Sequence, residues 1–359
     1  MSIPKYSADE LKVIGSYPPP IPAFPPSPKY DTPISIRDNF DLLFARKTPV
    51  WIPDTGEIAM FAPKAMPDNV ARGLIMDTDT LKPGEAGGKD IFGIEWEYVE
   101  QVGGSMVRPG KPYVGDIEHW EDYVTFPDFS KIDWAASAEN AKPLTDAGRP
   151  VSLWILNGLF ERLISFIDFE DAATALIDED QQDAVHRLFD KLADMYDELI
   201  GIYHKYYDPY IIYFHDDWGS QRSPFFSLDT CMEMIVPYLK RIVDSCHRRG
   251  IKFELHCCGQ VEMLVPAMIA AGVDTWSGQS MNDRPKLVRE YGDKFIFGVP
   301  APEIPEGTSS EEIRRLAEEF METYRHPVIL STMGMRNTNE FRNAVYELSR
   351  KRYDAEAGN

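Results

Sequence analysis

The sequence has few cysteines and an excess of negative charge. Four cysteines in 359 residues, two of them adjacent, do not make a disulfide framework, so we expect a reducing, cytoplasmic compartment. The 58 acidic residues outnumber the 37 lysines and arginines, which gives a formal net charge of −21. Because such a surface repels phosphate backbones, we expect no nucleic acid partner.

Long apolar runs are also absent. The least polar stretch, residues 261–273, is interrupted by Glu262 and Pro266 and is too short to cross a bilayer, so no membrane partner is expected. The first residues lack the basic start and apolar stretch of a secretory signal. No Gly-x-Gly-x-x-Gly pattern opens a helix after a strand and no P-loop is present, which disfavours dinucleotide and nucleotide binding.

Hydrophobic residues make up 43% of the chain, enough for a large core. The prolines of residues 17–26 indicate that residues 1–35 form an extended N-terminal arm, followed by a single domain over residues 36–359. Residues 53–150 show weak periodicity and many glycines, prolines and aromatics, which predicts an irregular insertion that covers a site. Within it, residues 90–97 are typical of a strand or hairpin edge.

From residue 151 onward, strand and helix patterns alternate. This alternation predicts a parallel sheet in the α/β class, and the number of units favours a closed (β/α)8 TIM-type barrel with a proline-rich N-terminal extension. The predicted strands are 49–52, 151–156, 209–214, 251–257, 273–277, 294–299 and 327–330. The apolar positions predict helices at 36–46, 180–200, 232–246, 261–272, 285–291, 309–324 and 337–351.

In such a barrel the active site lies at the carboxyl ends of the strands. Alternation along the strand at 251–257 puts Glu254, His256 and Cys258 on one face and leaves Cys257 on the other. A carboxylate, an imidazole and a thiolate are all zinc ligands, which predicts a metal site at this strand end. The alternative is a buried histidine among core cysteines.

A second polar group follows the strand at 209–214. Asp216 or Asp217, beside Trp218, could have a raised pKa and act as an acid, and together with His256 they are the candidate catalytic residues. The alternative is a helix cap or an ion pair with Arg222. Side chains that could line a substrate pocket are Tyr213, Trp218, Gln221, Trp276 and Gln279, with Trp96 as a further aromatic.

Two segments of the chain resemble a known family. Residues 215–227, His-Asp-Asp-Trp-Gly-Ser-Gln-Arg-Ser-Pro-Phe-Phe-Ser, and residues 247–259, ending in His-Cys-Cys-Gly, resemble the uroporphyrinogen decarboxylase superfamily, more narrowly its corrinoid-dependent methyltransferase branch. The segments at 32–34 and 49–53 are similar to the subgroup with anaerobic O-demethylases of methoxylated aromatics. The resemblance implies the same barrel and a zinc motif, His-x-Cys-Gly, on His256 and Cys258.

The chain departs from the family's zinc pattern at one point. Zinc methyltransferases of the family add a second cysteine near the last strand, where this sequence has Met333 and Met335. Thioether sulfur is a weak ligand for zinc. Glu254, Gln279 or another oxygen would therefore complete the site, or the metal is lost. The decarboxylase's own arginine-rich N-terminal motif is not seen.

Our leading hypothesis is a methyltransferase. A methyl group would pass from a small O-methyl donor, which the resemblance implies is a methoxylated aromatic, to cobalamin carried by a separate corrinoid protein. Zinc would act as a Lewis acid on the ether oxygen, and Asp217 or Asp216 would supply the proton. The alternatives are a metal-free decarboxylase-type lyase that uses Asp217 and His256, and a non-catalytic barrel that binds a ligand. A homodimer is left open.

Overall fold

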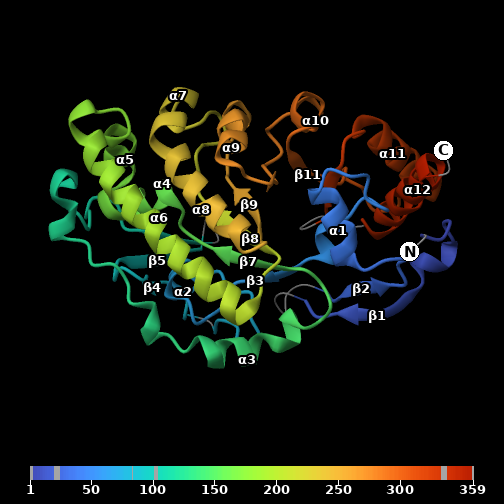
Figure 1. The fold of residues 1–359 in the computed structure, drawn as a ribbon, viewed down its shortest axis with the longest axis horizontal. Coiled ribbons are helices and arrows are strands. Elements are labelled where there is room, and N and C mark those ends of the chain that lie inside the picture. Colours follow the sequence, from blue (N-terminus) through green and yellow to red (C-terminus); the bar gives the residue numbers. More distant parts are fainter. Residues whose placement is uncertain (1–2, 20–24, 83, 101–103, 333–337, 358–359) are drawn as a thin grey trace. The chain divides into compact units, whose positions relative to one another are not determined.

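A computed structural model describes residues 3–19, 25–82, 84–100, 104–332 and 338–357 (Figure 1). The chain divides into two compact units. The first comprises Met1–Ala59, Ala147–Pro150 and Asp274–Asn359, and the second comprises Met60–Asp146 and Val151–Val273. In the described part of the chain, no helix combines the length and the apolar character needed to cross a membrane.

Parallel strands form the centre of the second unit. Strand β7 (Val151–Ile155) pairs in parallel with β8 (Ile211–His215), which pairs in parallel with β9 (Lys252–His256), and β3 (Ala59–Phe61) lies beside β7. The register puts His215 directly opposite His256. Helices separate these strands in the sequence, which confirms the predicted α/β class.

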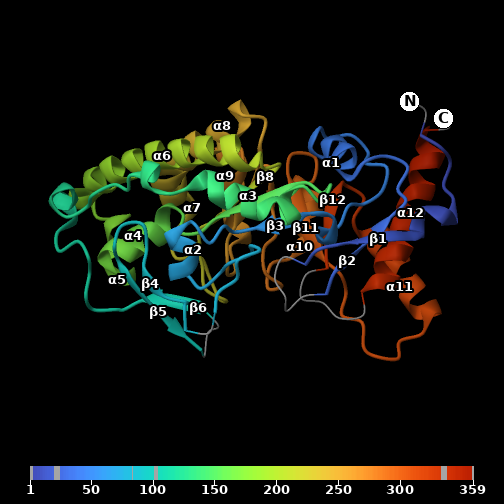
Figure 2. The same ribbon diagram turned by 90° about the horizontal axis from the view of Figure 1, so that it is seen from below.

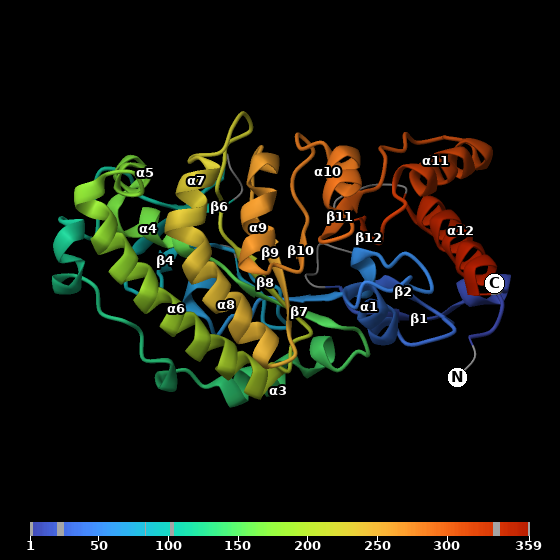
Figure 3. The ribbon, with the colours of Figure 1, turned by 45° about the horizontal axis from the view of Figure 1, so that its top comes forward.

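Three helices of the second unit lie over one face of these strands (Figure 3). They are α6 (Glu179–Tyr207), α8 (Val236–Arg248) and α9 (Val265–Ala271). The predicted apolar stripe of α6 is buried, and the Asp178 carboxylate caps its first turn by accepting from the Asp180 N–H. The other helices of this unit are α2 (Pro67–Ala71), α3 (Trp134–Thr145), α4 (Leu159–Ile167), α5 (Phe169–Ala175) and α7 (Leu228–Thr230), with 3-10 turns η3 (Ile117–Asp122), η4 (Phe129–Lys131) and η6 (Glu262–Leu264).

The helix predicted over residues 232–246 begins differently. Cys231–Ile235 is a π-helical turn, η5, and regular α-helix follows from Val236. Pro237 has no backbone N–H and cannot close an α-helical hydrogen bond to the preceding turn, which accounts for the widened turn. Cys231 and Cys246, on the apolar side of this helical segment, are fully buried.

Much of the irregular insertion folds around a small antiparallel sheet. It contains β4 (Gly88–Lys89), β5 (Glu95–Val99) and β6 (Gly104–Val107), and so confirms a hairpin at the predicted edge. In Figure 2 the sheet lies below α4 and α5. A buried ion-pair network ties it to α4, because Arg162 pairs with Asp68 and, at 2.7 Å, with Asp90, whose carboxylate also accepts from the Trp96 indole N–H.

The first unit has its own parallel strands. β10 (Thr275–Trp276), β11 (Ile296–Pro300) and β12 (Val328–Ser331) pair in that order. The predicted extended arm contains paired strands, since β1 (Val13–Tyr17) and β2 (Ser27–Tyr30) form an antiparallel ladder. The helices are α1 (Ile36–Phe44), α10 (Arg284–Tyr291), α11 (Ser310–Thr323) and α12 (Asn339–Ala357), with 3-10 turns η1 (Ala8–Leu11) and η2 (Thr55–Glu57).

The first predicted strand, residues 49–52, is wrong. The Asn39 side chain accepts from the Val50 and Trp51 N–H groups and donates to the Trp51 carbonyl, so these backbone groups bind a side chain instead of a sheet. One parallel bridge, Asp54 with Leu330, forms just beyond it. A barrel of eight strands was predicted. Among the described residues the corresponding strands are seven: β10, β11 and β12 in one group, and β3, β7, β8 and β9 in the other.

Candidate metal centre

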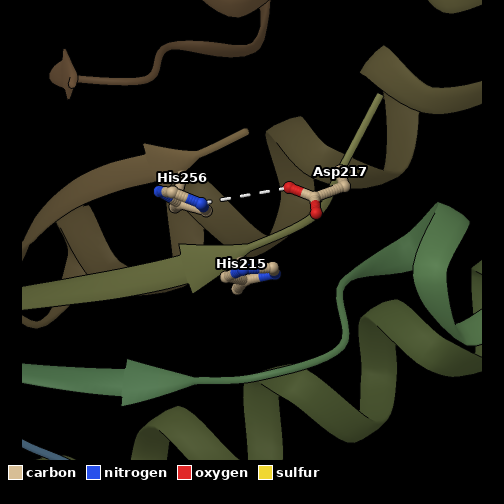
Figure 4. Close-up of side chains that lie close together, drawn as sticks. All are labelled: His215, Asp217 and His256. Carbon is tan, nitrogen blue, oxygen red and sulfur yellow. Dashed lines mark ion pairs between the residues drawn. The ribbon is translucent and has the colours of Figure 1, made fainter. Parts of the chain in front are cut away.

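Two histidines and an aspartate converge at the carboxyl ends of β8 and β9. His215 and His256 are the last residues of these strands, and their rings stack with centroids 4.4 Å apart. Asp217 follows two residues after His215. One possible ligand atom from each of the three lies within 4.8 Å of the others (Figure 4). We call His215, Asp217 and His256 the site cluster.

The predicted alternation along β9 is confirmed. Phe253, Leu255 and Cys257 are buried, whereas Glu254, His256 and Cys258 are partly exposed on the other face. Beyond the strand, Gly259 has φ +92°, and a Cβ there would lie 2.4 Å from the Gly219 backbone. Only glycine fits this close approach of the two loops, which brings Cys258 next to Asp217.

The thiol of Cys258 borders the site cluster. Its sulfur lies 3.3 Å from His256 Nε2, and its backbone N–H donates to Asp217 Oδ1 at 2.6 Å. The same Oδ1 lies 3.9 Å from His256 Nε2 (Figure 4). Of the predicted ligands, His256 therefore belongs to the cluster and Cys258 adjoins it. Glu254 is not in the group of converging ligand atoms found among the described residues.

Burial sets the protonation of the cluster. It lowers the pKa of His256 well below its ordinary value, and the neighbouring His215 lowers it further. It raises the pKa of Asp217, with the Glu161 carboxylate adding to the effect. His256 is therefore a neutral imidazole with a lone pair to offer, as a metal ligand requires.

A buried chain of hydrogen bonds holds His215. Its Nδ1 lies 2.6 Å from Glu161 Oε2, and the other oxygen of Glu161 accepts from Arg72 at 2.9 Å. Arg72 also donates to the Asn157 side chain at 2.6 Å. Although burial opposes ionisation of Glu161, Arg72 and His215 together hold its pKa below the ordinary value. Although burial opposes it, the Glu161 carboxylate raises the pKa of His215. Nδ1 therefore donates to Glu161, and a metal would bind at Nε2 by displacing the proton of that nitrogen.

Asp216 points away from the cluster. Its buried carboxylate accepts from the backbone N–H groups of Phe160 and Glu161, at the start of α4, and from the Trp218 indole at 2.9 Å. Burial, and then the Glu161 carboxylate, raises its pKa to about 7. The adjacent acids thus divide between two roles, with Asp216 holding α4 and Asp217 facing the cluster.

Three of the predicted pocket residues belong to the second unit, and they differ in their surroundings. Tyr213 stacks on Trp154 at 4.0 Å and on His256 at 5.4 Å, so it supports a cluster residue. Trp218 is fully buried in the core and Gln221 is exposed.

Two of the predicted pocket residues belong to the first unit. There Trp276 is fully buried with the Arg284 guanidinium over its ring, and the Gln279 carbonyl accepts from Arg284. Met333 and Met335, where the family has its second cysteine, lie outside the described residues.

A cavity of about 330 Å³ adjoins the cluster within the second unit. Arg72, Glu161 and Asp217 form its polar end. The rest of its wall comes from the β5–β6 hairpin, the following loop and the segment from α4 to α5. These residues are Trp96, Ser105, Met106, Val107, Pro109, Ile164, Ser165, Asp168 and Phe169.

Sequence reasoning missed three residues of this site. His215 stood at a strand end, and its spacing of two from Asp217 was a usable signal. Glu161 lies in the first turn of α4, directly after β7, which is also an active-site position in this fold. Arg72 had no comparable signal, because it follows the short helix α2 within the irregular insertion.

The donor set fits zinc. Two imidazoles and a carboxylate are protein ligands of catalytic zinc sites, where a fourth position stays open for substrate. The hydrogen bond from His215 to Glu161 is the outer-shell contact that orients such a ligand.

Comparisons with known proteins identify a matching family and a similar fold. Residues 160–333 match the model of the uroporphyrinogen decarboxylase (URO-D) family. A methyltransferase from Methanosarcina mazei has a similar fold, with a TM-score of 0.51 and 15% identity over 74% of this chain and 77% of that one.

A sugar phosphate isomerase/epimerase from Parabacteroides distasonis ATCC 8503 aligns with a TM-score of 0.34 and 10% identity over 65% of this chain and 81% of its own, too weak to support a conclusion. No curated protein matches the chain by sequence. The matched residues contain His215, Asp217, His256 and Cys258. The match confirms the resemblance drawn from the sequence: residues 160–333 are similar to the uroporphyrinogen decarboxylase family, and the fold is similar to that of a methyltransferase.

Proposed function

We propose that the protein is a methyltransferase built on a (β/α) barrel, which moves a methyl group from a small O-methyl substrate to a corrinoid protein. The observation that carries the proposal is the convergence of His215, Asp217 and His256 beside a largely apolar cavity. A metal-ligand set that opens on a ring-sized apolar space suits an aromatic ether better than a highly charged substrate.

His215, Asp217 and His256 would hold zinc, with the Cys258 thiol as a neighbouring fourth group. When bound, zinc supplies Lewis-acid polarisation of the ether oxygen, which makes the phenol a better leaving group. This ligand set contains a second histidine and an aspartate in place of the distal cysteine of the family's zinc enzymes.

The chain's own residues supply orientation and a dry site. Glu161 and Arg72 fix the ring of His215, and Tyr213 supports the ring of His256. Trp96, Ile164 and Phe169 enclose the substrate ring and exclude water. The carboxylate of Asp217 faces the cluster and can bind the metal, whereas the carboxylate of Asp216 is taken up by three donors.

The methyl acceptor would belong to a separate partner protein. Cobalamin would be carried by a separate corrinoid protein, which the family resemblance implies. That corrinoid would accept the methyl group released from the ether oxygen, and the demethylated substrate would leave this chain as a phenol once its oxygen has taken up a proton.

The test measures zinc content and methyl transfer in the same preparations. Wild-type protein is expected to hold about one equivalent of zinc and to methylate reduced cobalamin from a methoxylated phenol. His256→Ala should lose both, while Cys257→Ala, altered on the opposite face of the same strand end, should keep both. Asp217→Asn replaces the charged ligand by a neutral amide oxygen, so it should hold less zinc and transfer methyl groups more slowly than wild type.

Three results would contradict the proposal. One is less than about a tenth of an equivalent of zinc in active wild-type protein. The second is unchanged methyl transfer by His256→Ala. The third is release of carbon dioxide from an aromatic acid without metal, which would favour the lyase alternative.

A further inference from the structure

The cavity beside the site cluster has one polar side chain set apart from the rest. Ser105, on β6, is 8% exposed, and its hydroxyl has no hydrogen-bond partner among the described residues. It lies in the cavity wall. A buried hydroxyl without a partner costs free energy, so a ligand that supplies the missing bond is favoured there.

Apart from Asp217, which belongs to the site cluster, the other polar side chains of the wall already have partners. Glu161 binds Arg72 and His215, and Asp168 accepts from the Gly110 N–H at 2.7 Å. The Ser165 hydroxyl donates to the Arg162 carbonyl at 2.7 Å. These groups need no bond from a ligand.

The charges of the wall exclude an anion. Three carboxylates, Glu161, Asp168 and Asp217, stand against one guanidinium, that of Arg72, which is spent on Glu161. A divalent cation in the site cluster would balance these charges. With or without this cation, the Arg72 guanidinium is already paired with Glu161 and is not available to the carboxylate of a ligand.

The remaining wall is apolar and partly aromatic. Trp96, Val107, Pro109, Ile164 and Phe169 face the cavity, whose volume of about 330 Å³ accommodates a substituted benzene ring. One face of the Trp96 ring is already covered by the Arg72 guanidinium, with its carbon 5.3 Å from the ring centroid. A quaternary ammonium therefore finds that aromatic face occupied.

We propose that this cavity selects an uncharged methoxylated aromatic that carries a hydroxyl group, with Ser105 as the specificity-determining residue that binds this hydroxyl. The inference rests on the proposed function for the methoxy group. It assigns the substrate pocket to the β5–β6 hairpin and the α4–α5 segment, and not to Gln221, Trp276 or Gln279.

The experiment measures equilibrium binding by titration calorimetry on the full chain, without a corrinoid partner. The probes are 2-methoxyphenol, anisole, 3-methoxybenzoate and choline. We expect 2-methoxyphenol to bind about threefold to tenfold more tightly than anisole, the range set by one neutral hydrogen bond. The benzoate and choline should bind more weakly than anisole.

Two serine variants isolate the hydroxyl. Ser105→Ala should bring 2-methoxyphenol down to the affinity of anisole and leave anisole unchanged. Ser165→Ala removes a hydroxyl from the same cavity that is already satisfied, and it should preserve the ratio. Because Ser105→Ala removes an unsatisfied buried group, its thermal midpoint should equal or exceed that of wild type, so a folding defect cannot imitate the expected result.

The inference is overturned if 3-methoxybenzoate or choline binds as tightly as 2-methoxyphenol, or if the ratio survives in Ser105→Ala. Its failure differs from failure of the proposed function. Selective binding without methyl transfer would sink the function and keep the pocket. Methyl transfer with a ratio indifferent to Ser105 would keep the function and sink the pocket.

Discussion

Two clusters of titratable side chains, one in each unit, differ in whether their acceptor atoms already have hydrogen-bond donors. In the first unit, Asp54, Glu57 and Arg342 form what we call the Arg342 cluster. All four of its carboxylate oxygens have donors, from Arg342, the Trp51 indole and the backbone N–H groups of Asp54 and Gly56. In the second unit, the site cluster brings acceptor atoms of His215, Asp217 and His256 toward one another.

The difference distinguishes a structural cluster from a binding cluster. When every buried oxygen has a donor, the group is complete and its contribution is to stability. When lone pairs of several side chains converge, the repulsion is relieved by a cation, so the group is incomplete without a ligand. Composition alone does not distinguish the two clusters, since each combines carboxylate and basic side chains.

Removing the guanidinium of the Arg342 cluster should have the largest effect on stability. Arg342→Met leaves the buried Asp54 carboxylate without its counter-ion and removes a donor from Glu57, and we expect a loss of about 3–5 kcal/mol. Denaturant unfolding followed by circular dichroism measures this loss. Arg315→Met, on the exposed face of α11, is the control and should not shift the midpoint. Equal effects of the two variants would show that the buried carboxyl groups of Asp54 and Glu57 do not depend on the Arg342 guanidinium.

The Arg342 cluster should also make stability depend on pH. Burial, and then Asp54, raises the pKa of Glu57 to about 8. A raised folded-state pKa contributes stability that is present below the unfolded value, near 4.5, and is lost as the pH rises through 8. Glu57→Gln stays neutral, so between pH 5 and pH 8 wild type should lose up to a few kcal/mol more stability than the variant. Parallel pH profiles of the two proteins would refute this assignment.

In the site cluster, a change to a supporting residue should affect metal affinity. Glu161→Gln keeps a hydrogen-bonding side chain but lacks the charge that holds His215, and we expect zinc to bind about 10-fold to 100-fold more weakly. A competition titration with a chromophoric chelator gives the affinity. Glu170→Gln, exposed at the start of α5, is the matched control. An unchanged zinc affinity in Glu161→Gln would mean that His215 is not a ligand.

The smallest effect on the metal site should come from the acid that faces away. Asp216→Asn keeps one acceptor oxygen but turns an NH2 group toward the other buried donors, so it should cost about 1–3 kcal/mol of stability. Its zinc content should equal that of wild type, which thermal unfolding and metal analysis check together. If Asp216→Asn empties the site, the division of roles between Asp216 and Asp217 is reversed.

The sequence predicted regular elements well where periodicity was strong. The strands and helices after residue 151 appear in the predicted order, because each buries an apolar stripe or a strand face whose spacing is visible along the chain. The strand at 49–52 failed because the Asn39 side chain, more than ten residues away, takes its backbone hydrogen bonds. Such a competitor cannot be recognised from local pattern.

The site was predicted in part for the same reason. His256 and Asp217 were found because strand alternation and strand ends are local properties. Arg72 and Ser105 were missed because they come from the irregular insertion, and their places in the cavity depend on how the hairpin and α2 pack on α4. Which of two adjacent acids faces the site also depended on a partner, the start of α4, rather than on the pair itself.

The metal-ligand candidates and the selective wall of the cavity are carried by different elements. His215, Asp217 and His256 lie at the ends of β8 and β9, while Trp96, Ser105, Met106 and Val107 belong to the hairpin. Trp96 is coupled to the cluster through Arg72, which lies over its ring and binds Glu161. Substitutions at hairpin positions without such a contact should combine nearly additively with those in the site cluster. Under our proposal, ligand preference can therefore be altered from the hairpin while the metal ligands stay in place.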